Sequence, residues 1–213
     1  MGNSVKPRKP TRRTDKPNSQ TPGLVRIIGG DWRGRKLPVL HQNGLRPTSD
    51  RVRETLFNWL QFELPGARCL DAFSGSGALG FEALSRGASQ VVMIEKQGEV
   101  AKQLQANVDL LKAANAQIVN ADSLSWLSQT AQQTFDIVFV DPPFGLGLVE
   151  PTLQGLFEGN WLNHQAWLYI EQEKALDWPS MPEGWLLHRE KTTSQVRLGL
   201  WHKPEYDVSL SDS

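Results

Sequence analysis

The stretch DAFSGSGALG, residues 71–80, predicts the fold around which the rest of the chain is organised. Its glycines Gly75, Gly77 and Gly80 form a G-x-G-x-x-G pattern that follows a β-prone segment and opens a helical one. Glycine lets the backbone turn tightly and come close to a ligand. With Glu95 at the end of the next β-prone segment, the pattern is typical of a nucleotide-binding strand–turn–helix unit in an α/β protein.

The acid that opens this stretch favours one class of ligand. Asp71 lies where the pyrophosphate of a dinucleotide would approach, and two negative charges repel each other in a partly dehydrated cleft. S-adenosylmethionine has no phosphate and carries an ammonium and a sulfonium, so Asp71 would attract it. Glu95 would bind the ribose hydroxyls, and Asp122 would cap a helix, contact the adenine, or do both. The expected cofactor contacts are Asp71, Phe73, Gly75, Gly77, Glu95, Lys96, Asp122 and Ser123.

Strands and helices alternate along the chain beyond the glycine-rich loop. This alternation is typical of a mostly parallel sheet with helices on both faces. Two late β-prone segments follow each other without a crossover helix, so they predict an antiparallel hairpin at one edge of the sheet. The predicted strands are 67–73, 90–95, 117–121, 135–140, 166–172, 185–191 and 195–203, and the predicted helices between them are 77–87, 97–113, 123–131 and 149–158.

The fourth predicted strand ends in the run Asp141-Pro142-Pro143-Phe144. A rigid turn accounts for the prolines, but not for the acid and the aromatic ring beside them. Because the carboxyl ends of parallel strands meet at one edge of the sheet, this run would lie beside the cofactor. The Asp141 carboxylate and the Pro142 carbonyl can accept both hydrogens of an exocyclic base amine, Pro143 fixes that carbonyl, and Phe144 stacks on the base. The sequence therefore predicts methyl transfer to a base amine.

Charge is unevenly divided along the chain. The 213 residues include 23 Lys and Arg and 23 Asp and Glu, but residues 1–60 hold 13 of the basic residues and only four of the acidic ones. A segregated basic segment is typical of nucleic-acid binding. Trp32 is as well suited to core packing as to base stacking, and Arg53 also fits a solvated helix face. The candidate RNA contacts are Arg26, Trp32, Arg33, Arg35, Lys36, Arg46, Arg51 and Arg53.

The basic segment divides into a tail and a structured extension. Residues 1–22 have almost no apolar side chains, and we expect them to be disordered. Residues 24–40 predict a β-hairpin with its turn at Gly29-Gly30, and residues 46–62 predict a helix capped by Thr48 or Ser49. The expected segments are a tail at 1–22, an RNA-binding extension at 23–62, a methyltransferase domain at 63–205 and a second tail at 206–213.

The composition also indicates the environment of the protein. The single cysteine, Cys69, lies in an apolar segment and cannot form an internal disulfide, which suits a reducing cytoplasm. The sequence contains no run of about 18 apolar residues, so it predicts no membrane span. The basic N-terminus lacks the apolar segment of a secretory signal. We expect a cytoplasmic monomer that binds no membrane and uses no metal.

Together the motifs resemble a known family. The segments RIIGGDWRGRKL, LRPTSDRVRETLFNWL, DAFSGSGALGFEALSRGA, VFVDPPF and LHREK are similar to the RsmD-type 16S rRNA guanine-N2 methyltransferases, from about residue 24 to about residue 203. The resemblance implies a class I methyltransferase fold with a Rossmann-like sheet, and S-adenosylmethionine as cofactor. It also implies that the substrate is one guanine of 16S rRNA, within the small ribosomal subunit or its assembly intermediate. By resemblance, residues 141–144 hold the guanine amine.

Three alternatives stay open on the sequence alone. A DNA amino-methyltransferase acting on adenine N6 or cytosine N4 would share the Asp-Pro-Pro-Phe run, although such enzymes usually carry a larger target-recognition region. An NAD-dependent oxidoreductase is disfavoured by Asp71, and a non-catalytic RNA-binding module by the intact glycine loop.

His188 suggests a general base, but a methylated ammonium loses its proton readily and needs no such base. We expect a structural or RNA-contact role for His188, with Arg189 and Lys191 beside it.

Overall fold

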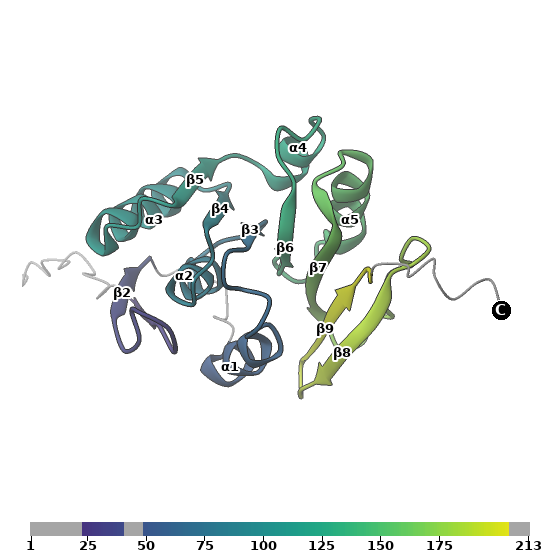
Figure 1. The fold of residues 1–213 in the computed structure, drawn as a ribbon, viewed down its shortest axis with the longest axis horizontal. Coiled ribbons are helices and arrows are strands. Elements are labelled where there is room, and N and C mark those ends of the chain that lie inside the picture. Colours follow the sequence, from purple (N-terminus) through teal and green to yellow (C-terminus); the bar gives the residue numbers. More distant parts are fainter. Residues whose placement is uncertain (1–22, 41–48, 205–213) are drawn as a thin grey trace, which may run out of the picture.

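The computed structural model describes residues 23–40 and 49–204. Its main sheet contains β3 (Arg68–Asp71), β4 (Gln90–Glu95), β5 (Ala116–Asn120), β6 (Phe135–Val140), β7 (Leu162–Glu173), β8 (Leu186–Thr192) and β9 (Val196–His202). These seven strands lie in the order β5-β4-β3-β6-β7-β9-β8 (Figure 1). The strands from β5 to β7 are parallel, whereas β9 runs antiparallel to both β7 and β8. This confirms the predicted mostly parallel α/β sheet with an antiparallel C-terminal edge.

Helices cover both faces of the sheet. They are α1 (Asp50–Trp59), α2 (Ala78–Ser85), α3 (Gly98–Leu111), α4 (Ser123–Leu127) and α5 (Val149–Glu158). Successive side chains of a strand point to opposite faces. In β6, Ile137 and Phe139 pack with α1, α2 and α3, whereas Val138 and Val140 pack with α4 and α5. The central strands are therefore buried on both sides, which explains their continuous apolar sequence.

The order of the strands fixes where a ligand can bind. The chain runs outward from β3 through β4 to β5, and then returns to place β6 on the other side of β3. In such sheets the ligand crevice lies at the carboxyl ends of the strands, where the order reverses. Asp71 of β3 is in register with Phe139 of β6. Asp141 follows Phe139 by two residues, so the two acids end neighbouring strands at this crevice.

The N-terminal hairpin packs against α2 and α3 (Figure 1). Its strands β1 (Gly23–Arg26) and β2 (Lys36–Val39) pair antiparallel, and Val25, Ile27 and Leu37 are buried in the same core as α1, α2 and α3. The hairpin is confirmed, but the predicted turn at Gly29-Gly30 is wrong. The chain turns at residues 31–34, because the backbone N–H groups of Ile28 and Gly29 are bound by Glu82 of α2.

The predicted cap of α1 is confirmed, but one residue of the helix was misplaced. The Ser49 side chain accepts a hydrogen bond from the Val52 N–H. Arg53, predicted to face solvent or RNA, is only 1% exposed. Its guanidinium lies 2.6 Å from Asp50 and 3.9 Å from Glu82, which is itself 0% exposed. A buried carboxylate needs a cation beside it, so Arg53 stabilises the interior and is not available to RNA phosphates.

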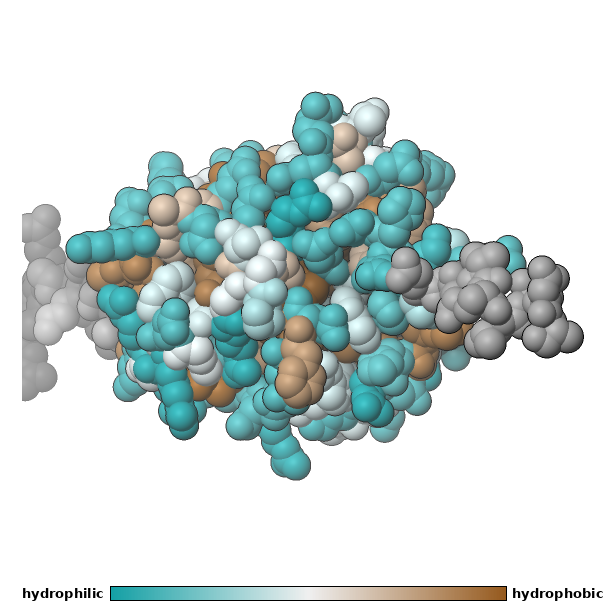
Figure 2. Space-filling view, viewed as in Figure 1, coloured by the Kyte–Doolittle hydropathy of each residue, from teal (hydrophilic) through white to brown (hydrophobic). Residues whose placement is uncertain are grey.

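The remaining features of the interior and the surface are simple. Cys69 is buried, and burial raises the pKa of its thiol, as expected of a core residue. The face seen in Figure 2 is mostly hydrophilic, with apolar residues in separate small patches. Among the described residues, no helix combines the length and the apolar character that a membrane crossing requires.

Candidate active site

Asp71 ends β3 beneath the glycine-rich loop. Its carboxylate accepts a hydrogen bond from the backbone N–H of Gly80 at 3.1 Å, and the residue is 2% exposed. Burial raises the pKa of Asp71 to about 7, and the Glu95 carboxylate adds to the rise, although hydrogen bonds from Gly80, Phe73 and Ser74 oppose it. A cation beside this carboxyl would favour its ionised form. The prediction of S-adenosylmethionine rested on this attraction between the Asp71 carboxylate and a cationic ligand.

The three glycines of the loop have different roles. Gly75 and Gly77 have φ angles of +48° and +76°, in the left-handed region that glycine adopts without strain. The Gly77 N–H also closes the turn by donating to the Ser74 carbonyl at 2.7 Å. Gly80 has an ordinary φ, but a side chain there would come within 2.6 Å of the Met93 sulfur. Gly75 and Gly77 therefore shape the loop, and Gly80 lets α2 pack closely on β4.

Glu95 lies at the end of β4, beside the loop. Its carboxylate accepts hydrogen bonds from the Gly75 N–H at 3.0 Å and the Gln97 N–H at 2.7 Å. Glu95 thus fastens the glycine loop to the next strand, a role that the sequence did not reveal. Binding of the ribose hydroxyls by Glu95 stays a prediction.

The third group of predicted contacts lies at the start of α4. Asp122 caps this helix by accepting the Ser125 N–H at 3.1 Å, and it pairs with Lys96 at 3.1 Å. The Ser125 N–H and Lys96 both lower the pKa of Asp122. The Ser123 hydroxyl donates to the Ala72 carbonyl, which joins α4 to the loop after β3. The cap is confirmed, and the adenine contact of Asp122 stays a prediction.

The Asp-Pro-Pro-Phe run leaves the sheet directly after β6. Asp141 is half-buried, Pro142 is buried, and Pro143 is exposed. The Phe144 ring is 45% exposed beside the strand ends, as a base-stacking surface requires. After it, the Gly145 N–H donates to the Glu173 carboxylate at the end of β7, so the loop is anchored on its far side.

Two buried polar residues at this edge were missed by the sequence analysis. The Tyr169 hydroxyl donates to Oε2 of Glu171 at 2.7 Å, and both side chains are buried. They belong to β7, where Ile170 is in register with Val140 of β6. Glu171, the next residue of β7 and two residues before the strand ends, therefore lies next to Asp141. The single acid near the end of the predicted strand 166–172 was the available signal, because a carboxylate interrupts an otherwise apolar strand.

The predicted RNA contacts fall into three groups. Arg26 is exposed and pairs with Asp50 at 3.2 Å, while Trp32 is partly buried against the core, which favours the packing role left open for it. Arg46 lies outside the described residues. Lys191 of β8, which was not in that set, donates from its ammonium to the Thr55 hydroxyl of α1 at 2.8 Å. The remaining candidates are exposed: Arg33, Arg35, Lys36 and Arg51.

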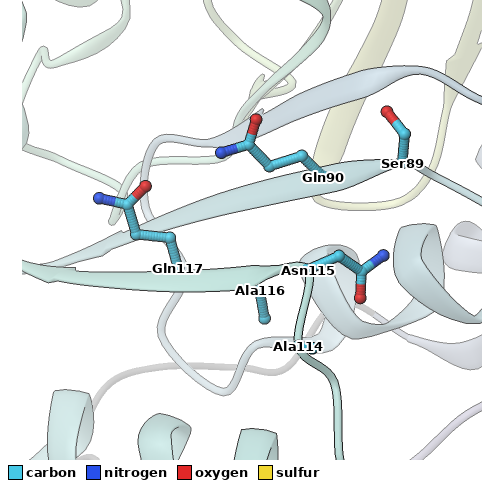
Figure 3. A pocket seen from close by; sticks show the side chains of 6 residues that line it. All are labelled: Ser89, Gln90, Ala114, Asn115, Ala116 and Gln117. Carbon is cyan, nitrogen blue, oxygen red and sulfur yellow. The ribbon is translucent and has the colours of Figure 1, made fainter.

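An open hollow on the surface lies at the other end of the strands (Figure 3). The residues around it precede or begin β4 and β5, so they lie at the opposite ends of these strands from Glu95 and Asn120. Ligands of parallel sheets bind at the carboxyl ends, and we do not assign the hollow to the active site. Its lining residues are Ser89, Gln90, Ala114, Asn115, Ala116 and Gln117.

Comparison with known proteins decides the family. The family model described as Conserved hypothetical protein 95 matches residues 25–202. The chain belongs to this family. One relative is Ribosomal RNA small subunit methyltransferase D of Escherichia coli strain K12. It is 50% identical to this chain over 197 residues, which are 92% of this chain and 99% of the relative. The protein of the same name from Haemophilus influenzae is 51% identical over 189 residues, which are 85% and 97% of the two chains.

A solved structure agrees with these sequence matches. Escherichia coli yhhF superimposes with a TM-score of 0.80 and 49% identity, and the match covers 85% of this chain and 98% of yhhF. Membership of the Conserved hypothetical protein 95 family confirms the resemblance to the RsmD-type methyltransferases and the predicted class I methyltransferase fold.

Proposed function

We propose that the chain is an S-adenosylmethionine-dependent methyltransferase that methylates the N2 amine of one guanine in 16S rRNA. It acts on the small ribosomal subunit or its assembly intermediate, as a monomer in the cytoplasm. The observation that carries the proposal is the position of Asp71 and Asp141 at the ends of the neighbouring strands β3 and β6. One acid suits a cationic cofactor, and the other belongs to a run that suits a base amine. The relatives named for small-subunit rRNA methylation support this substrate.

The residues around β3 fit the cofactor. Asp71 is a buried carboxyl whose pKa of about 7 would fall beside a cation, and a Cβ at Gly75 would meet nothing within 4 Å. Asp71, Gly75 and Gly77 would hold the charged end of S-adenosylmethionine, with Phe73 beside them. Glu95, Lys96, Asp122 and Ser123 would surround its nucleoside. When bound, the cofactor supplies an electrophilic methyl group on a sulfonium.

The residues after β6 would prepare the nucleophile. The lone pair of an aromatic amine is delocalised into the ring, so the amine is a poor nucleophile. The Asp141 carboxylate and the Pro142 carbonyl would accept its two hydrogens, favour a tetrahedral nitrogen and stabilise the positive charge that develops there. Phe144 would stack on the guanine, and Pro143 would hold the Pro142 carbonyl in place. Holding the amine in line with the methyl group would provide much of the rate.

The basic surface would position the rRNA. Arg26, Arg33, Arg35, Lys36 and Arg51 would contact phosphates, which fix orientation without reading sequence. We assign these residues to an extension at 23–62 and the catalytic residues to a domain at 63–205. The alternatives of a DNA methyltransferase, an oxidoreductase and a non-catalytic module receive no support from the family comparison.

The deciding experiment is methylation of a defined particle. The purified protein is incubated with tritiated S-adenosylmethionine and small subunits from cells that lack this methylation, and the modified nucleotide is mapped. We expect one labelled methyl group per subunit, on N2 of a single guanine. Subunits that carry the methyl group already, and duplex DNA, serve as controls. Label in DNA, or no label in the unmethylated subunits, would contradict the proposal.

A further inference from the structure

The pair of Tyr169 and Glu171 has no role in the function proposed so far. Glu171 is 4% exposed, and its described partner is the neutral hydroxyl of Tyr169, 2.7 Å from Oε2. Within residues 23–40 and 49–204, no Lys, Arg or His forms an ion pair with Glu171. Buried carboxyl groups are normally paired with a cation, so an acid that lacks one at a crevice is a candidate for binding a ligand.

The pairing of the strands puts Glu171 beside Asp141. Val140 of β6 is in register with Ile170 of β7, so Asp141 and Glu171 are the next residues along two neighbouring parallel strands. Such strands lie about 4.8 Å apart. Phe139 and Tyr169 pack in one core cluster, with ring centroids 6.4 Å apart, so the odd-numbered residues of both strands point to the same face. The carboxyl groups of Asp141 and Glu171 therefore belong to one side of the substrate site.

We propose that Glu171 accepts a hydrogen bond from the N1–H of the target guanine, beside the N2 amine held by Asp141, and so selects guanine over other purines. The proposal rests on the proposed function. Guanine presents the N1–H and the N2 amine side by side on its Watson–Crick edge. Adenine has an acceptor at N1, which a carboxylate would repel. Enzymes that act on a base taken out of its stack read this edge by hydrogen bonds.

Tyr169 acts as a positioning residue for this contact. Its hydroxyl donates a hydrogen bond to Oε2 of Glu171, and this bond fixes the plane of the carboxyl group. The Tyr169 ring is 0% exposed and packs edge-on to Phe139 within the core, so the hydroxyl is held by packing. A carboxyl group held on one side can accept a hydrogen bond only along restricted directions. The same pair thus gives the acid an orientation that a flexible surface glutamate would not have.

The test compares two bases at one position. Small subunits are reconstituted from rRNA that carries either guanine or 2-aminopurine at the target nucleotide. 2-Aminopurine retains the reactive 2-amine but has an acceptor at N1. The ratio of kcat/KM for guanine to that for 2-aminopurine is measured for the wild type and for Glu171→Gln, whose amide can donate to the N1 of 2-aminopurine. We expect Glu171→Gln to lose about 10- to 100-fold on guanine, and the ratio to fall at least about tenfold.

Two further measurements separate selection from folding. Affinity for S-adenosylmethionine, measured by calorimetry, should be unchanged in Glu171→Gln. Should that variant fail to fold, Tyr169→Phe retains the carboxylate and should lower the same ratio. A loss of equal factor on both bases, or an unchanged ratio in Tyr169→Phe, would overturn the assignment of Glu171. A wild-type enzyme that is inactive on guanine would instead overturn the proposed function, and the assignment with it.

Discussion

The backbone nitrogen of Gly80, in the first turn of α2, lies 3.1 Å from Oδ2 of Asp71. Backbone N–H groups at the start of a helix stabilise a negative charge. Burial acts in the opposite direction and is the larger effect, because the pKa of Asp71 is about 7. The carboxyl group therefore changes its protonation near neutral pH, and this gives both ligand binding and stability a measurable pH dependence.

Affinity for S-adenosylmethionine should rise about tenfold between pH 6 and pH 8. Only the ionised carboxyl of Asp71 attracts the cationic cofactor, and a group with a pKa of about 7 is mostly protonated at pH 6. Calorimetry across this range, in buffers of different ionisation enthalpy, should also detect proton release on binding below pH 7. Asp71→Asn should bind weakly at every pH. A flat profile for the wild type would contradict this role of Asp71.

The variant Asp71→Asn should be more stable than the wild type, most clearly above pH 7. The pKa of Asp71 rises from 3.8 to about 7 on folding, so the folded state binds an additional proton between these values. The wild type therefore loses stability relative to the variant as pH rises from about 4 to 7, and the difference is constant above 7. Urea unfolding should show a gain on the order of 3 kcal/mol at pH 8 and less at pH 5. An equal gain at both values would exclude titration of Asp71.

The variant Asp141→Ala should keep its cofactor affinity and lose turnover by about 100- to 1,000-fold, because it removes one acceptor for the charge that develops on the amine. Phe144→Ala should mainly weaken productive substrate binding, by about 1–3 kcal/mol of stacking. Single-turnover rates at saturating particle concentration separate the two effects. Leu146→Ala, in the same exposed loop, is the matched control. Near-normal turnover in Asp141→Ala would refute the amine contact.

The variant Glu82→Ala should destabilise the protein by about 3–5 kcal/mol, because it leaves Arg53 buried without a full partner. The carboxylate also binds the N–H groups of Ile28 and Gly29 and the Arg86 guanidinium. Glu99→Ala removes an exposed acid from α3 and should change stability by less than about 1 kcal/mol. Urea unfolding of both variants tests this, and equal effects would argue against the buried network.

Charge reversal of the hairpin should weaken rRNA binding alone. Arg33→Glu combined with Lys36→Glu removes two exposed cations, and we expect kcat/KM on small subunits to fall about tenfold or more at low salt. The loss should shrink as salt increases, while cofactor affinity stays constant. Lys102→Glu combined with Lys112→Glu, in α3 and directly after it, changes the net charge by the same amount and is the control, although it also breaks a surface pair with Glu99. Equal losses in both variants would show that the hairpin has no special contact.

The architecture was predictable because it depends on local patterns. Apolar segments that alternate with amphipathic helices indicate a parallel sheet, and the glycines with Asp71 mark the end of its first strand. The capping role of Asp122 was also visible, since an acid before a helix has a local partner in the Ser125 N–H.

Contacts between distant residues were not predictable. Arg53 was expected at the surface because a charged residue usually is, but its buried partner Glu82 belongs to another helix. The hairpin turn was placed at Gly29-Gly30 by the usual preference of glycine, whereas Glu82 holds that segment and moves the turn onward. Glu171 was missed because its position beside Asp141 depends on the pairing of β6 with β7. The sequence of one strand does not show which strand pairs with it.

The attachment of the hairpin to α2 has a consequence for synthesis of the protein. The N–H groups of Ile28 and Gly29 find their acceptor 54 and 53 residues further along the chain. At a translation rate of about 5–20 residues per second, a nascent hairpin waits about 3–10 seconds before Glu82 has even been made. During that interval its apolar side chains have no core to enter. Among the segments that the structure describes, the hairpin leaves the ribosome first and should thus be among the last to reach its native contacts. Pulse proteolysis of stalled nascent chains would reveal the delay.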